Sequence, residues 1–435
     1  MNHNRKRSLA VAAGIVAVST AVSGCAGFGA GGGGGGEAGS NELTFTTWAG
    51  DSEAVAFEAL IKQFEAENDG VTVKLNRVPY AQMFAGIDAK LSSGTAPDIF
   101  RVDYGNLGVY SSQDQLLDLT PYLAEEEDSF IPAMWQAVSY EDKVYGVPHQ
   151  TDVSAVLVNT DMLTEAGVDV ASLPMTQADA WTWDEFADVA KQLRTALPAE
   201  KYPFVYNWQL GGAPRWLSWL FQANGALLES DGTTPAIDSP AGEKALDFTK
   251  SFYENQWVPP TSSTKSSIYA GTTFQEGTAA MVFAGSFLLP DMETLAKFNW
   301  TAIPMPRDER GATDLGGNAL VATKDTKNPE LAAKFLAFMV QADSMSAFCA
   351  ATNQLPTRTD LAGDDIEFIV RPDVMPVFVE QASTIEPSDV TQLTSPAMAA
   401  ISTALQDELE AAFVGGQSTQ DTLGNLTRAI EEASE

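Results

Sequence analysis

The sequence predicts an α/β protein built on mainly parallel sheets. Short stretches of alternating polarity take turns with longer stretches in which apolar residues recur every three or four positions. Strand and helix alternating at this spacing is typical of βαβ units, in which successive strands run parallel. The chain has 435 residues, which is long enough for two domains after an N-terminal segment of unusual composition.

The first units follow one another from residue 43. Residues 43–47 read as a strand, and a helix follows in which Phe57, Leu60, Ile61 and Phe64 share one face. Further strands are predicted at 71–75 and 98–102, with a helix at 83–91 between them. Ligands of parallel sheets bind beyond the carboxyl ends of the strands, and here those ends carry Trp48, Asp51 and Asp103.

The middle and the end of the chain continue the alternation. Thr182 and Glu185 form a capping-box pattern that opens a helix, and Ser239-Pro240 opens another. The remaining predicted elements are strands at 153–158 and 279–283, a helix from Asn328-Pro329, and helices at 398–413 and 417–432 that are separated by Gly415-Gly416.

The N-terminus has the order of a secretory signal. A basic start (Arg5-Lys6-Arg7) precedes the apolar run 9–22, which is shorter than the about 20 residues that span a bilayer. The run ends in Val-Ser-Gly-Cys25, which resembles the lipobox of bacterial lipoproteins. The resemblance implies a signal peptide at 1–24 and lipid on Cys25, followed by a glycine-rich tether at 25–40. An ordinary cleaved signal with a chance cysteine is the alternative.

Composition disfavours several classes of function. The net charge of −33 repels nucleic acid and anionic lipid headgroups. Cys349 has no partner if Cys25 is acylated, and it lies in an apolar helical context typical of a core residue. His149 is the single histidine beyond the signal, and no metal-spaced cluster or glycine-rich phosphate loop occurs. We therefore expect no metal and no cofactor.

Ten different short motifs follow one another along the whole body of the chain. They stand at 43–51, 96–103, 144–148, 158–163, 182–186 (Thr-Trp-Asp-Glu-Phe), 274–281, 285–287, 316–319, 328–330 and 355–358. Each motif is weak alone. Their order and spacing resemble those of the extracellular solute-binding proteins of ABC importers, in the large group that includes maltose-binding proteins.

This resemblance implies a two-lobed periplasmic-binding-protein fold of type II, with a ligand cleft between the lobes. One lobe would combine 41–151 with 317–354, and the other 152–316 with 355–435. The crossings would lie near 150–152, 316–318 and 353–358. Ligand would close the lobes by hinge motion. The loaded protein, a monomer held by lipid on the outer face of the bacterial membrane, would then dock on a membrane permease.

The resemblance also points to polar residues of the cleft. Asp51, Asp103 and Asp152 fall where the family has sugar-binding carboxylates, although each alone also suits a helix cap or a solvated loop. Asn318 and Arg358 are candidate donors at the second and third crossings. Carboxylates and amides suit the hydroxyl groups of a sugar.

Aromatic rings would face the apolar faces of the sugar. Trp208 and Trp216 fall in a stretch from which the family draws stacking aromatics, and of Trp216 and Trp219 we favour Trp216 for the cleft. Phe287 stands where maltose-binding proteins have a stacking tryptophan, and Tyr104 stands where they have an arginine. Val379 replaces a further tryptophan, which argues against maltose itself. Trp48 suits core or cleft, whereas Trp183 and Trp300 suit packing.

Three functions therefore compete. The first is capture of a di- or oligosaccharide for an ABC importer, without turnover. The second keeps this role for a polyamine, glycerophosphodiester or peptide; a phosphate ligand would want clustered basic residues, and we find only Arg101, Arg215 and Arg358 as candidates. The third is a surface glycosidase that uses two carboxylates; the order of the segments argues against it.

Overall fold

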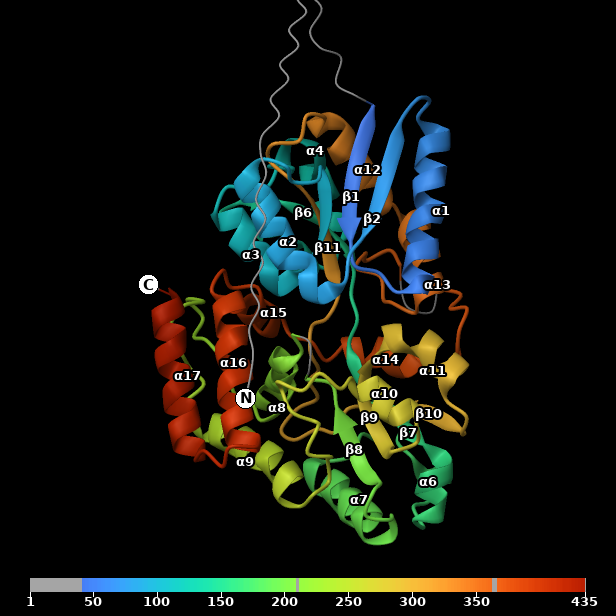
Figure 1. Cartoon of the computed structure of the whole chain (residues 1–435), viewed down its shortest axis with the longest axis vertical. Coiled ribbons are helices and arrows are strands. Elements are labelled where there is room, and N and C mark those ends of the chain that lie inside the picture. Colours follow the sequence, from blue (N-terminus) through green and yellow to red (C-terminus); the bar gives the residue numbers. More distant parts are fainter. Residues whose placement is uncertain (1–40, 209–210, 362–365, 435) are drawn as a thin grey trace, which may run out of the picture. The chain divides into compact units, whose positions relative to one another are not determined.

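The computed structural model describes residues 41–208, 211–361 and 366–434, and the predicted alternation of strands and helices is confirmed there. Cys25, the signal segment and the tether lie outside the described residues. The body belongs to one compact unit that contains two main sheets, with β1, β2, β6 and β11 in the upper part of Figure 1 and β7, β8, β9 and β10 in the lower part.

The first sheet has five strands in the order β2-β1-β3-β11-β6. These are β1 (Glu42–Thr47), β2 (Thr72–Arg77), β3 (Ile99–Asp103), β6 (Gly146–Gln150) and β11 (Asn318–Ala322). β1 pairs in parallel with β2 and β3, whereas β11 runs antiparallel to both of its neighbours. Every strand except β11 therefore has the same direction.

The second sheet has four strands in the order β10-β7-β9-β8. These are β7 (Ser154–Asn159), β8 (Tyr202–Tyr206), β9 (Ala279–Gly285) and β10 (Trp300–Ile303). β8 and β9 are parallel, and β7 is antiparallel to β9 and β10. The prediction of mainly parallel sheets is confirmed, with one reversed strand in each. A short hairpin pairs β4 (Ser139–Tyr140) with β5 (Lys143–Val144).

The chain crosses between the sheets close to the predicted places. β6 ends at Gln150 and β7 begins at Ser154, and the backbones of Thr151 and Leu355 exchange hydrogen bonds of 2.9 and 2.8 Å. The Thr151 hydroxyl donates to the carbonyl of Gly316 at 3.1 Å. Gly317 has a φ of +92°, and a Cβ there would collide with Thr151, so this close approach requires glycine. The exact division into lobes stays a prediction.

Helices connect the strands and cover the sheets. In chain order they are α1 (Asp51–Glu67), α2 (Tyr80–Ser93), α3 (Tyr104–Ser112), α4 (Thr120–Leu123), η1 (Ala124–Ser129), α5 (Pro132–Ala137), α6 (Thr160–Glu165), η2 (Val170–Ser172), α7 (Trp183–Ala196), η3 (Ala213–Trp216), α8 (Leu217–Gln222), α9 (Pro240–Glu254), α10 (Ala270–Gln275), η4 (Ser286–Leu288), α11 (Leu289–Leu295), α12 (Pro329–Met339), α13 (Ala342–Thr352), α14 (Met375–Ala382), α15 (Pro387–Leu393), α16 (Met398–Phe413) and α17 (Thr419–Ser434).

Local chemistry explains where these helices begin. Thr182 accepts from the Glu185 amide, and the Glu185 side chain accepts from the Thr182 amide at 2.8 Å, as the capping box predicts. Ser239 caps α9 through the Gly242 amide. Phe57 and Phe64 of α1 lie in the core beside the first sheet, where Cys349 is also buried.

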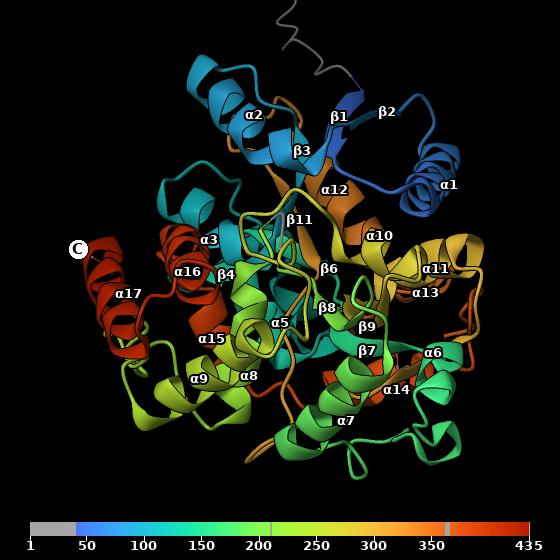
Figure 2. The same ribbon diagram turned by 60° about the horizontal axis from the view of Figure 1, so that its bottom comes forward.

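The C-terminal helices pack against helices from the first part of the chain. α16 packs against α17 and also against α3, and Figure 2 shows α16 between them. α15 packs against α5. In the described part of the chain no single helix qualifies by length and apolarity to cross a membrane, and the bent pair α12 and α13 meets that test together.

Candidate functional site

A cavity of about 830 Å³ lies where the two sheets approach. Residues after β1 and β3 line one wall, and residues after β8 and β9 line the other. Its volume is in the usual range of small-molecule sites, about 300–1,000 Å³. The carboxyl-end rule therefore located the first of these walls, and the family resemblance pointed to residues of the second.

The structure brings seven of the ten predicted ligand residues to this cavity. They are Trp48, Asp51, Asp103, Tyr104, Asp152, Phe287 and Asn318. Trp208, Trp216 and Arg358 are elsewhere. The seven residues thus line the cavity wall, and their contact with a ligand stays a prediction.

Asp103 is the polar centre of the wall that the first sheet contributes. Its Oδ1 accepts from the Asn318 amide at 2.6 Å, and its Oδ2 accepts from the Tyr80 hydroxyl at 2.8 Å. Burial raises the pKa of Asp103, against the opposing effects of Tyr80 and of the Arg101 charge. The two donors hold the carboxyl group in one orientation.

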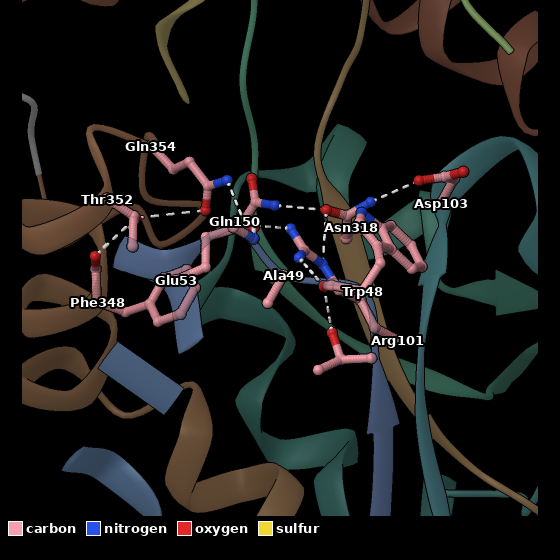
Figure 3. A network of polar contacts seen from close by, with 12 residues as sticks. Trp48, Ala49, Glu53, Arg101, Asp103, Gln150, Asn318, Phe348, Thr352 and Gln354 are labelled. Atoms are coloured by element: carbon pink, nitrogen blue, oxygen red, sulfur yellow. Dashed lines mark hydrogen bonds and ion pairs between the residues drawn. The ribbon is translucent and has the colours of Figure 1, made fainter. Parts of the chain in front are cut away.

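Arg101 belongs to this wall and connects several of its parts (Figure 3). Its guanidinium donates to Asn318 Oδ1 at 2.9 Å, to the Trp48 carbonyl at 2.8 Å and to Glu53 Oε1 at 2.7 Å. Its Cζ atom also lies 4.7 Å from the centre of the Trp48 ring. Burial raises the pKa of Glu53, but the charge and hydrogen bond of Arg101 outweigh it and leave that pKa below its ordinary value.

The remaining predicted residues of this wall differ in exposure. Asp51 is 98% exposed and forms an ion pair with Arg77 at 3.1 Å, so it lies at the rim. Tyr104 is buried, and its hydroxyl donates to the Gln150 carbonyl at 3.0 Å. Trp48 combines the two predicted roles, because its ring packs edge-on against Tyr80 and also lines the cavity.

Asp152 dominates the opposite wall. It is 6% exposed, and its Oδ1 has no hydrogen-bond partner among the described residues. Gly316 and Gly285 crowd this oxygen so closely that a Cβ at Gly316 would collide with it. Burial raises the pKa of Asp152 to about 7, with Arg215 opposing and Asp314 adding to the rise. The described residues therefore leave this buried oxygen without a hydrogen bond.

Several residues of this second wall were not predicted as sugar ligands. Arg215, considered only for phosphate, forms an ion pair with Asp314, with Nε 3.1 Å from Oδ2. The Oδ1 atom of Asn207 is buried and has no partner in the described part of the chain. Asn207 directly follows β8, so the carboxyl-end rule could have found it, whereas the loop residues Asp314 and Tyr269 carry no such signal.

Trp208 and Trp216 are corrections, because the structure places both in the core beside the second sheet. The Trp208 ring stacks on Tyr206 with 3.8 Å between centroids. Trp216 is fully buried, and its Nε1 donates to Thr249 of α9 at 3.0 Å. The short helix η3 therefore turns Trp216 inward and presents Pro214 and Arg215 to the cavity.

Arg358 is also a correction. Its guanidinium donates to both oxygens of Asp360 at 2.8 Å and to the Val340 carbonyl at 3.1 Å. It further lies over the Phe130 ring. These contacts fasten the third crossing segment to its surroundings, and Arg358 is absent from the cavity wall.

Phe287 is the aromatic residue that β9 delivers to the cavity. It lies two residues beyond the end of β9, within η4, and its ring lines the wall. The packing roles expected of Trp183 and Trp300 agree with their exposures of 5% and 8%. Among the described residues, no group of three or more histidine, cysteine, aspartate or glutamate side chains is arranged to hold a metal ion.

Two open sheets, joined by three adjacent crossings, with a polar and aromatic cavity between them define a two-lobed solute-binding protein. The chain matches the family described as bacterial extracellular solute-binding protein over residues 59–374, and it belongs to that family.

Individual relatives are similar over most of their length. The maltodextrin-binding protein MdxE of Bacillus subtilis is 26% identical, and the match covers 86% of each chain. A maltooligosaccharide ABC transporter solute-binding lipoprotein of Streptococcus pneumoniae is 26% identical over 74% of each chain. The structure of an ABC transporter solute-binding protein from Thermotoga lettingae, bound with α-D-tagatose, superimposes with a TM-score of 0.77 at 21% identity, covering 91% of this chain and 100% of that one.

Proposed function

We propose that the protein captures a carbohydrate, a di- or oligosaccharide, in the cavity and delivers it to the permease of an ABC importer. The observation that carries the proposal is the composition of the walls. Asp103 and Asp152 supply carboxyl groups, Asn207 supplies an amide group, and Phe287 and Trp48 supply aromatic faces. Hydroxyl groups and apolar C–H faces alternate on a sugar, so it matches such a wall. Similarity to relatives named for maltodextrin and maltooligosaccharides supports this choice.

The charges of the cavity argue against a phosphodiester. Arg77, Arg101 and Arg215 are the basic residues of the described wall, and each already pairs with a carboxylate. A phosphate group would have to compete with Asp51, Glu53 or Asp314 for them.

A polyamine is the second candidate. Asp152 is a buried carboxyl group and Asp103 a half-buried one, and neither forms an ion pair within the described residues. An ammonium group would supply the missing positive charge. The protein would then bind a cation where we propose that it binds hydroxyl groups.

A thermal-shift screen of the purified protein separates these ligands. A ligand at 100 times its dissociation constant that binds only the folded state adds about 2.7 kcal/mol to the free energy of unfolding. Mono-, di- and trisaccharides, polyamines and glycerophosphodiesters form the panel. A shift with one family of saccharides supports the proposal, and a shift with polyamines alone overturns the sugar assignment. Release of smaller sugars from a bound saccharide would show an enzyme instead of a binding protein.

We also propose that the protein is held on the outer face of the cell membrane by lipid at Cys25. The support is the lipobox-like sequence before Cys25 and the similarity to a streptococcal lipoprotein. Cys25→Ser should release the protein into the medium without changing its affinity. Fractionation of cells followed by immunoblotting measures this, and a variant that stays with the membrane contradicts the anchor.

A further inference from the structure

Arg101 is the buried charge that the proposed binding role does not yet use. It stands in the middle of β3, 2% exposed, while its guanidinium reaches three other segments of the chain. Those segments are the end of β1 at Trp48, the first turn of α1 at Glu53, and the start of β11 at Asn318. One side chain thus connects the end of one strand, the start of another strand and the first turn of a helix.

The contact with Asn318 determines how its amide group faces the cavity (Figure 3). Asn318 Oδ1 accepts from Arg101 Nε at 2.9 Å and from Gln150 Nε2 at 2.7 Å. With two donors on Oδ1, the amide nitrogen must point the other way, and it donates to Asp103 Oδ1 at 2.6 Å. The reverse orientation would set the Asn318 carbonyl oxygen against the Asp103 carboxyl group, which is electrostatically unfavourable.

The same network contains residues from all three crossings. Gln150 ends the strand before the first crossing, Asn318 follows the second, and Gln354 lies in the third. Gln354 Nε2 donates to Glu53 Oε1 at 2.9 Å, on the oxygen that also receives Arg101. A change at Asp103 can therefore reach each crossing through a short chain of hydrogen bonds.

We propose that Arg101 is a positioning residue, which fixes the Asp103 carboxyl group for the ligand through Asn318 and links that group to the three crossings. The inference rests on the proposed function, since it assigns Asp103 to the ligand. Arg101 also lines the cavity, but its guanidinium already donates to Asn318, Trp48 and Glu53, so it acts through the orientation of other groups.

A double-mutant cycle of binding tests the positioning role. Arg101→Lys keeps the charge but loses the fork that holds three acceptors, and it should weaken sugar binding about tenfold, the scale of one hydrogen bond to a charged group. Asp103→Asn should also weaken binding, and the double variant should be no weaker than Asp103→Asn alone. Losses that multiply would show that Arg101 acts independently of Asp103, and the proposal would be wrong.

Arg371→Lys is the matched control. Arg371 lies 4.1 Å from the centre of the Trp300 ring and pairs with Asp373 at 2.7 Å, away from the cavity wall. It should leave sugar affinity unchanged. If Arg101→Lys does not fold, Asn318→Leu removes the link between Arg101 and Asp103 while keeping the Arg101–Glu53 ion pair, and it should weaken binding in the same direction. Unchanged affinity in that variant would overturn the proposal.

A second readout needs no ligand. In Arg101→Lys, backbone amides near 150–154, 316–320 and 352–356 should exchange with deuterium faster together, while segments of the second sheet away from the crossings keep their rates. A uniform increase over the whole protein would mean a general loss of stability and would contradict the link to the crossings. If no saccharide binds the parent protein, the proposed function fails, and the exchange result still decides the role of Arg101.

Discussion

The two walls of the cavity differ in how completely their polar groups are satisfied. On the first-sheet wall, Arg101, Glu53 and Asp103 each have hydrogen-bond partners, and Asn318 connects two of them. On the second-sheet wall, Asp152 and Asn207 each bury an oxygen that has no partner in the described part of the chain.

This difference separates two tasks of a binding site. A wall whose groups are already bonded is preorganised, so ordering it costs the ligand little. A wall with unmet acceptors favours a ligand that brings donors, because a buried acceptor left without a bond costs about 1–3 kcal/mol. Under the proposed function, the first wall would set the geometry of the ligand, and the second would provide the gain on binding.

Breaking the bonded wall should have the largest effect. Arg101→Met removes one partner of a buried ion pair and leaves Glu53 uncompensated, so we expect a loss of about 3–5 kcal/mol in the free energy of unfolding. The double variant Arg101→Met/Glu53→Gln should lose less, because no lone charge remains. Urea denaturation measures both, with the exposed pair Arg77–Asp51 as a control in which Arg77→Met changes little. Equal losses in the single and double variants would argue against the ion pair as the cause.

Removing the unpartnered carboxyl group of Asp152 from the second wall should raise the free energy of unfolding at alkaline pH, whereas Arg101→Met lowers it. The folded pKa of Asp152 is about 7, above its ordinary value of 3.8, so the folded state binds the extra proton between these pH values. Stability from this group is therefore present at acid pH and is lost as pH rises through 7. Without ligand, Asp152→Asn should be similar to the parent at pH 4 and more stable than it at pH 8. The gain should be a few kcal/mol, because a tenfold change in an acid constant corresponds to about 1.4 kcal/mol.

Unfolding free energies of the two proteins across this pH range test the prediction. Burial and the Arg101 charge lower the pKa of His149 to about 3, which also makes stability depend on pH, but both proteins share that histidine and the difference between them cancels it. If the difference in unfolding free energy between the parent and Asp152→Asn does not change with pH, burial does not raise the pKa of this carboxyl group.

Asp103 and Asp51 sharpen the comparison within one wall. The sequence treats them alike, since each follows a strand, but the structure half-buries Asp103 among side-chain donors and exposes Asp51 at the rim. Asp103→Ala should weaken sugar binding by about 1–3 kcal/mol, whereas Asp51→Ala should change it little. Isothermal titration calorimetry compares the two, and equal losses would place the ligand nearer the rim.

The sequence predicted the walls better than the side chains on them. Strand ends are set by periodicity and topology, so Trp48, Asp103 and Phe287 were found from local patterns and the family motifs. Arg215 and Asp314 lie far apart in the sequence, and no local pattern announces their pairing. The same holds for Arg101, which reads as an interior strand residue until Asn318 and Glu53 are seen around it.

The wrongly placed tryptophans show a second limit. Trp216 lies in a short helix beside glycines and a proline, where the sequence does not reveal which side faces inward. Its orientation depends on Thr249 of the distant α9, which accepts the indole N–H. Tertiary contacts of this kind decide the facing of a single turn, and the same argument applies to Arg358 and Asp360 within the third crossing.

The smallest expected effect comes from a comparison of Phe287, an aromatic residue of the cavity wall, with Trp216, an aromatic residue of the core. Phe287→Ala should weaken sugar binding by about 1 kcal/mol through loss of a stacking face, with little change in stability, because the ring lines the cavity. Trp216→Phe is its counterpart: it should lower the free energy of unfolding, since it removes buried volume and the bond to Thr249, and leave affinity unchanged. Calorimetric titration and denaturation of both variants give four values to compare. A loss of affinity in Trp216→Phe that exceeds the loss in Phe287→Ala would return Trp216 to the ligand site and contradict its assignment to the core.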